Sequence, residues 1–178
     1  METFAPAQPF VHNPKYRDDC EQVKTALDLN AVDAPIRVII TAFNKLHYCY
    51  TLQCCYGHFV HAAQSNPHNL ERLPAHDVGQ VHYRIAYLAL CLEESAPGIR
   101  LRSLLELVPQ IGAGYIQFGS SKWFWEPHPN SYALQVVPER FRERDTVTIE
   151  YQEALHVQSV RDMFFKRLEK IAGDCISG

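Results

Sequence analysis

The chain has 178 residues, the size of one ordinary domain, and is long enough to bury a core without disulfides or metals. Hydrophobic residues make up 47% of it and charged residues 21%, a composition that excludes a disordered chain. The net charge of −3 excludes a surface that is basic overall, so any contact with RNA must be local.

The first fourteen residues contain three prolines and no periodic pattern, which is typical of an extended arm. They lack the basic and apolar segments of a secretory signal, and no window approaches the roughly 18 apolar residues of a membrane-spanning helix. We therefore expect a cytoplasmic protein with reduced cysteines, made of an arm over residues 1–14 and one domain over residues 15–178.

Two helices are expected at the start of the domain. The first covers about residues 16–29 and ends at Asn30. The second follows Asp33, a residue type that caps helix N-termini, and carries an apolar stripe at helical spacing, formed by Ile36, Ile39, Ile40, Phe43 and Leu46.

Residues 48–61 hold three cysteines and two histidines and are rich in strand-forming residues, so we predict a buried strand broken near Gly57. Residues 64–79 predict a long loop of the kind that acts as a lid. Residues 80–92 fit a helical stripe or a strand, and we favour a strand because the run is almost wholly apolar after Arg84.

The second half of the chain predicts a short helix over residues 99–108 and strands over 115–118, 122–125 and 131–137, with a hinge at Gly119–Ser121. Residues 139–146 carry balanced charge and predict a solvated connection. A last helix runs from Tyr151 to Ala172 and stops at Gly173. This order predicts a single α+β domain whose mixed or antiparallel sheet packs with about four helices.

The segment Thr51–His58, Thr-Leu-Gln-Cys-Cys-Tyr-Gly-His, resembles the Thr-Thr-Ser-Ser-Cys-x-Gly-Arg segment of the wybutosine-synthesis methyltransferases. That family N-methylates a modified guanosine of phenylalanine tRNA with S-adenosylmethionine. Thr51, Cys55 and Gly57 match its segment, whereas His58 replaces its arginine. The resemblance implies S-adenosylmethionine as cofactor and an RNA or a small molecule as substrate. Loss of the arginine removes a fixed charge suited to phosphate or carboxylate, so the substrate can differ even where the fold is shared.

From this segment we predict a small-molecule pocket in which Cys55 and His58 are catalytic and Thr51 and Gly57 bind the ligand. Small residues and a lysine beyond it suit an anionic group, although their spacing is not that of a phosphate loop and also fits a hairpin turn. The aromatic run that follows is typical of ligand and partner anchors. The predicted floor of the pocket is therefore Gly119–Trp125, in which Gly119, Ser120, Ser121, Lys122 and Trp123 bind the ligand.

Two other interpretations stay open, and so does the question of whether the protein is an enzyme. One is a ligand-binding or protein-interaction module without catalysis, in which the cysteines are core residues. The other is a zinc- or cysteine-dependent hydrolase. We expect no metal, because the spacing matches neither a zinc finger nor the helical His pair of zinc proteases. If a metal binds, its ligands come from His47, Cys49, Cys55, His58 and His61.

Overall fold

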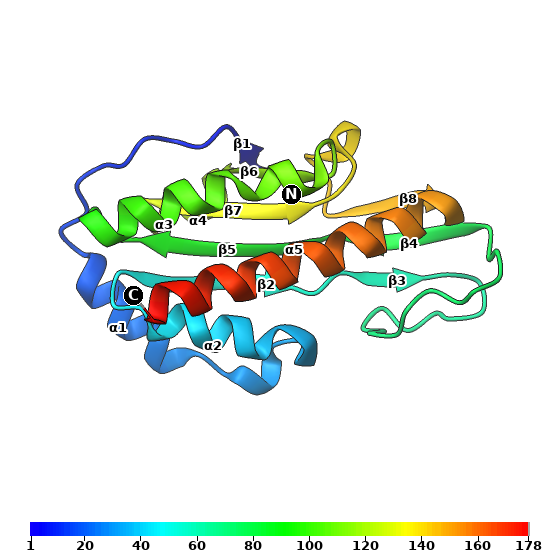
Figure 1. Cartoon of the computed structure of the whole chain (residues 1–178), viewed down its shortest axis with the longest axis horizontal. Coiled ribbons are helices and arrows are strands. Elements are labelled where there is room, and N and C mark those ends of the chain that lie inside the picture. The colour runs from blue at the N-terminus through cyan, green and yellow to red at the C-terminus, as the bar shows by residue number, and fades with distance from the viewer. Residues whose placement is uncertain (178) are drawn as a thin grey trace.

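Eight strands form two antiparallel sheets in the computed structural model, which describes residues 1–177 (Figure 1). One sheet has the order β1-β6-β7-β5-β2 and the other the order β3-β4-β8. Their bounds are β1 (Phe4–Ala5), β2 (Cys49–Cys55), β3 (His58–Val60), β4 (Gln80–Arg84), β5 (Ala86–Leu92), β6 (Ile116–Ser121), β7 (Ser131–Val136) and β8 (Thr146–Glu150).

The chain passes from one sheet to the other at two breaks that pack against each other. Gly57, with a φ of +90°, separates β2 from β3, and Ile85 separates β4 from β5. A Cβ at Gly57 would lie 2.9 Å from the Cβ of Ala86, so only glycine fits this turn. Beside it, the buried hydroxyl of Tyr83 accepts from the Ala86 amide at 2.8 Å and donates to the Val136 carbonyl at 2.9 Å. The junction of the two sheets is therefore fixed by packing and by hydrogen bonds.

The helices described are α1 (Tyr16–Ala26), α2 (Arg37–Lys45), α3 (Ala96–Glu106), α4 (Lys122–Trp125) and α5 (Tyr151–Ser177). α5 runs diagonally across both sheets and contacts α2, β4, β7 and β8 (Figure 1). Its buried stripe meets the stripe of α2 in one apolar core, because both helices repeat apolar residues at helical spacing. Among residues 1–177, no helix has the length and apolar character needed to cross a membrane.

The N-terminal arm lies along the five-stranded sheet. Its residues Phe4 and Ala5 form β1 and pair with β6. Farther along, the Asn130 side chain donates to the Val11 carbonyl and accepts from the Val11 amide, both at 2.8 Å. The arm therefore forms an edge strand of the five-stranded sheet and is bound to it a second time through Asn130.

The α+β class is confirmed, and both sheets are antiparallel. The strand prediction for residues 80–92 is also confirmed, as β4 and β5. Within the described residues there are five α-helices where we predicted about four, because residues 122–125 form the single turn α4.

Three local predictions were wrong. Residues 122–125 are helical rather than extended, and Gly119–Ser121 continue β6 instead of forming a hinge or hairpin turn, since β6 pairs with β1 and β7 on its two sides. α5 continues past Gly173 to Ser177, because one glycine in a helix costs only about 1 kcal/mol and does not by itself end it.

Candidate functional site

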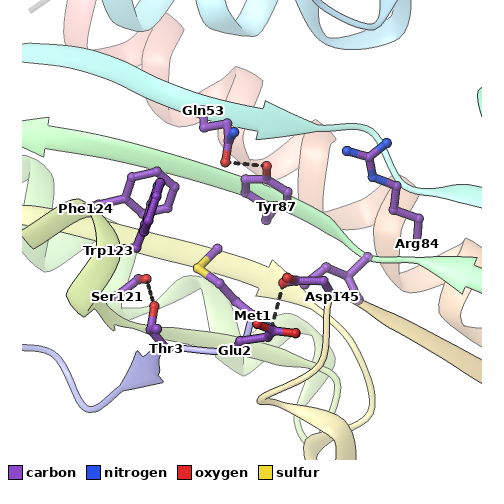
Figure 2. Close-up of a pocket in the computed structure, with 11 residues that line it drawn as sticks. Met1, Glu2, Thr3, Gln53, Arg84, Tyr87, Ser121, Trp123, Phe124 and Asp145 are labelled. Carbon is purple, nitrogen blue, oxygen red and sulfur yellow. Dashed lines mark hydrogen bonds and ion pairs between the residues drawn. The ribbon is translucent and has the colours of Figure 1, made fainter.

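A cavity of about 330 Å³ lies on the face of the five-stranded sheet that is turned away from α5 (Figure 2). Strands β2 and β5 form its base, α4 one wall, and the N-terminal arm and the β7–β8 connection the other. Its lining is Met1, Glu2, Thr3, Gln53, Arg84, Ile85, Tyr87, Ser121, Trp123, Phe124 and Asp145. We call it the Trp123 cavity.

Three aromatic side chains give this cavity its apolar surface. Trp123 is 74% exposed, which is unusual for so large an apolar ring, whereas Phe124 beside it is buried. Across the cavity, the Tyr87 hydroxyl donates to Gln53 Oε1 at 2.7 Å (Figure 2). Burial raises the pKa of Tyr87, so its hydroxyl stays a donor at neutral pH.

The rim of the Trp123 cavity carries charges of both signs. Arg84 stands at the junction of β4 and β5, and Glu2 and Asp145 belong to the arm and to the β7–β8 connection (Figure 2). The α-amino nitrogen of Met1 lies 3.5 Å from Asp145 Oδ1. A ligand in this cavity therefore meets a cation and carboxylates around an aromatic centre.

A second cavity, of about 490 Å³, adjoins the first. The two share Gln53, Trp123 and Phe124, and the second continues to Leu52, Glu126, Pro127 and His128. Trp123 and Phe124 thus stand between two hollows on the same face.

The predicted floor residues divide between the cavity and the core. Ser121 and Trp123 line the Trp123 cavity. Gly119 and Ser120 are buried beneath the arm, where Ser120 Oγ accepts from the Gln8 amide at 3.1 Å. Lys122 points into solvent and lies 3.5 Å from Glu126. Because Gly119 and Ser120 lie under the arm and within the paired strand β6, they cannot contact an anion from solvent.

Of the methyltransferase-like segment, Gln53 lines this cavity, whereas Thr51, Cys55, Gly57 and His58 do not. Thr51 is buried on the α2 side, where its Oγ1 accepts from Asn44 Nδ2 at 2.6 Å and its amide donates to Asn44 Oδ1 at 3.1 Å. Cys55 stands opposite the lining residue Tyr87 in the pairing of β2 with β5. The segment therefore reaches the cavity through Gln53 and the Cys55–Tyr87 pair.

Cys55 and His58 meet instead in a second group with Asp33, which we call the Asp33 cluster. The carboxylate, thiol and imidazole each place one ligand-type atom within 4.8 Å of the others. His58 Nε2 lies 3.2 Å from Asp33 Oδ2, and His58 Nδ1 lies 3.1 Å from the Asn69 carbonyl oxygen. The Tyr56 amide donates to the same carboxylate oxygen at 2.8 Å. Asp33 precedes a helical turn, as predicted, but its side chain makes no capping bond and holds this cluster together instead.

The thiols of this region are not poised as nucleophiles. Burial raises the pKa of Cys55, against the opposing effects of the Gly57 amide and of Arg84. Burial also raises the pKa of Cys54 to about 12. Cys54 lines an apolar groove with Leu27 and Val32, away from His58. Both shifts disfavour the thiolate that a cysteine nucleophile requires.

The other predicted metal ligands lie apart from the Asp33 cluster. Cys49 begins β2 and Cys55 ends it, a separation of roughly 20 Å along a strand. His47 is exposed and packs edge-on against Tyr48, and His61 pairs through its backbone with Gln64. Of the five residues that the sequence suggested as ligands if a metal binds, the structure therefore brings together only Cys55 and His58.

The predicted lid does not cover either cavity. In residues 64–79 the Leu73 amide donates to Gln158 Oε1 at 2.7 Å, and Pro74 accepts from the Tyr151 hydroxyl at 2.5 Å. The loop is thus bound to α5, and its Asn69 carbonyl contacts His58. It supports the Asp33 cluster rather than closing a pocket.

Arg161 is the residue of this region that the sequence did not single out. It is 1% exposed, donates to the Gly57 carbonyl at 3.0 Å, and lies over the rings of Tyr56 and Phe59. A signal was present, because residue 161 falls within the apolar stripe of α5, four residues after Val157. A charge in such a stripe marks a buried partner.

No protein-family profile matches the chain, and no curated protein matches it by sequence. Two solved structures are similar to parts of the fold. The PH1069 protein from Pyrococcus horikoshii is 14% identical with a TM-score of 0.44, covering 89% of this chain and 93% of its own. A hypothetical protein from Aeropyrum pernix is 10% identical with a TM-score of 0.41, covering 80% of this chain and 96% of its own.

Proposed function

We propose that the protein binds S-adenosylmethionine in the Trp123 cavity and is a methyltransferase acting on an RNA or a small molecule. The observation that carries this proposal is the combination of three aromatic side chains with a guanidinium and two carboxylates around one cavity of about 330 Å³. That volume lies within the range of ligand pockets. The resemblance of Thr51–His58 to a methyltransferase segment supports methyl transfer as the reaction, and the cavity supports binding of a ligand.

The groups present fit the parts of this cofactor. A purine ring stacks on an exposed indole such as Trp123, and a sulfonium cation is stabilised by aromatic faces such as Tyr87. The carboxylate of the cofactor's amino acid suits Arg84, as a planar guanidinium binds carboxylates well. Its ammonium and ribose hydroxyls donate to carboxylates, for which Glu2 and Asp145 are placed. The cofactor supplies an activated methyl group, and the chain binds and orients it.

The adjoining cavity offers a place for the methyl acceptor. It opens on the other side of Trp123 and Phe124, and it contains one carboxylate, Glu126, and one imidazole, His128. Methyl transfer requires the acceptor atom and the methyl group to be held in contact, and the two cavities adjoin at the lining residues they share, Gln53, Trp123 and Phe124.

Calorimetric titration with S-adenosylmethionine tests the proposal. We expect saturable binding to the parent protein, and at least about fivefold weaker binding by Trp123→Ala, because base stacking on an aromatic ring contributes about 1–3 kcal/mol. Val38→Ala is the control, since Val38 is 58% exposed on α2, outside the cavity. Absence of binding by the parent protein at millimolar cofactor would end the methyltransferase proposal.

One observation favours a second candidate, a binding module without catalysis. Cys55 and His58, the catalytic residues that the sequence suggests, lie outside the cavity lining. Such a module predicts binding of the cofactor or of its demethylated product, S-adenosylhomocysteine, without turnover. Incubation with labelled cofactor and total RNA or a metabolite extract separates the two, because only the methyltransferase transfers the label.

A further inference from the structure

Two hydrogen-bond acceptors face each other inside the Asp33 cluster. The Asn69 carbonyl can only accept, so its contact of 3.1 Å with His58 assigns a proton to Nδ1 of the ring. In a neutral ring, Nε2 then directs its lone pair toward Asp33 Oδ2, 3.2 Å away. An acceptor pair at this separation requires a cation between or beside its atoms, either a proton or a metal ion.

Cys55 adds a third ligand atom of the right kind. Thiolate, imidazole and carboxylate are the three side-chain ligands that zinc takes, at about 2.0–2.3 Å. Tetrahedral geometry with such bonds places the ligand atoms roughly 3.3–3.8 Å apart. The carboxylate–imidazole distance of 3.2 Å is close to this, and all three atoms lie within 4.8 Å of one another. Small rotations of the side chains suffice to close the set on one ion.

The surrounding chain holds the cluster in the manner of a metal site. Cys55 and His58 flank a tight turn whose glycine, Gly57, has a φ of +90°. The Asn69 carbonyl fixes the ring orientation of His58, as outer carbonyls do for metal-binding histidines. Asp33, with a side chain 24% exposed, leaves a route from solvent. His58 and Cys55 are almost fully buried, at 2% and 3%.

We propose that Asp33, Cys55 and His58 bind a divalent transition-metal ion, of which zinc is the best match, with a fourth position for water. On binding, the thiol of Cys55 loses its proton to solvent and the sulfur becomes a thiolate ligand. The ion also displaces the proton that His58 and Asp33 share in its absence, so two protons are released per ion. This site is separate from the Trp123 cavity, and it stands whether or not a cofactor binds there.

Cobalt(II) titration of the protein after chelator treatment tests the site, because a thiolate ligand gives cobalt a near-ultraviolet charge-transfer band that oxygen and nitrogen ligands do not. We expect this band to saturate at one cobalt per chain and to disappear when zinc is added. Affinity should rise by up to about a hundredfold for each pH unit over the range in which the metal-free cluster holds both protons, because two protons are released. Asp33→Asn should weaken binding by at least tenfold.

The adjacent cysteines provide a matched pair. Cys55→Ser should abolish the charge-transfer band, and Cys54→Ser should keep it, because Cys54 lines the apolar groove instead of the cluster. If a cluster variant fails to fold, the parent protein still decides: zinc should raise its unfolding temperature, and chelation should lower it. The proposal is overturned if the parent shows neither the charge-transfer band nor a shift in unfolding temperature, a result that would leave a proton between His58 and Asp33. It is also overturned if Cys54→Ser loses the band and Cys55→Ser keeps it.

Discussion

Arg161 places a full positive charge in the core, and the residues around it explain why it is tolerated. The guanidinium donates to the Gly57 carbonyl at 3.0 Å and to Asp162 Oδ1 at 3.0 and 3.2 Å, and it lies 4.0 Å from the centroid of the Tyr56 ring. It thereby holds the turn that carries Cys55 and His58. Removing one member of such a buried and fully hydrogen-bonded group destabilises the fold, because its partners are left without a hydrogen bond.

Arg161→Ala should lower the free energy of unfolding by about 3 kcal/mol, because it leaves the Gly57 carbonyl without its donor and a void between two rings. Chemical denaturation measures this loss. Lys166→Ala, an exposed change on the same helix, should stay within about 0.5 kcal/mol. A loss below about 1 kcal/mol for Arg161→Ala would show that the turn does not depend on this side chain.

The sequence showed which side chains of the Asp33 cluster are reactive, but not which of them lie together in the fold. Cys55 and His58 stood out because reactive side chains are dense around them. Asp33, more than twenty residues earlier, was assigned to a helix cap, because a capping carboxylate and a ligand carboxylate are the same residue type in the sequence. Only the fold, which brings the start of α2 beside the β2–β3 turn, distinguishes the two roles.

Among the elements, long periodic segments were predictable and short ones were not. α2 and α5 have apolar stripes over several turns, so their type was plain from the sequence. The four residues of α4 are too few to show a period, and the strand prediction for Trp123–Trp125 rested on aromatic content alone. Since the Trp123 cavity depends on that turn, its existence was not predictable, although Ser121 and Trp123 were named as ligand residues.

The glycines of α5 and of the loop before β6 give a test of backbone conformation. A Cβ at Gly173 or at Gly114 would meet no atom within 4 Å, but Gly114 has a φ of +81° and Gly173 is helical. Gly173→Ala should therefore stabilise the protein by about 0.5–1 kcal/mol, and Gly114→Ala should destabilise it by about 1–2 kcal/mol. Thermal unfolding of both variants measures the difference. Equal effects would mean that α5 does not extend through Gly173 in solution.

In the whole molecule, the N-terminal arm closes one edge of the five-stranded sheet and one wall of the Trp123 cavity. β1 pairs with β6 through Phe4 and Ala5, and Thr3 and Ser121 share a hydrogen bond beside the cavity (Figure 2). Proline content predicted an extended arm, but not its place, since pairing with a strand more than 100 residues away leaves no local pattern. The arm therefore couples the edge of the sheet to the ligand site.

Gly119→Ala tests that coupling, because the new Cβ would lie 2.3 Å from the Ala5 carbonyl oxygen and 2.7 Å from the Phe4 ring. Backbone cannot yield cheaply at such a distance, so β1 must leave β6, at a cost of about 1–3 kcal/mol. We expect faster proteolysis within residues 1–14 and weaker cofactor binding at the Trp123 cavity.

In a chain shortened to begin at Gln8, the clashing atoms are gone, and the same substitution should cost less than about 0.5 kcal/mol, so the two changes are not additive. Denaturation of the four proteins in this cycle measures the coupling. If Gly119→Ala costs as much without the arm as with it, the strain comes from β7 or the core, and the arm is not what requires a glycine at this position.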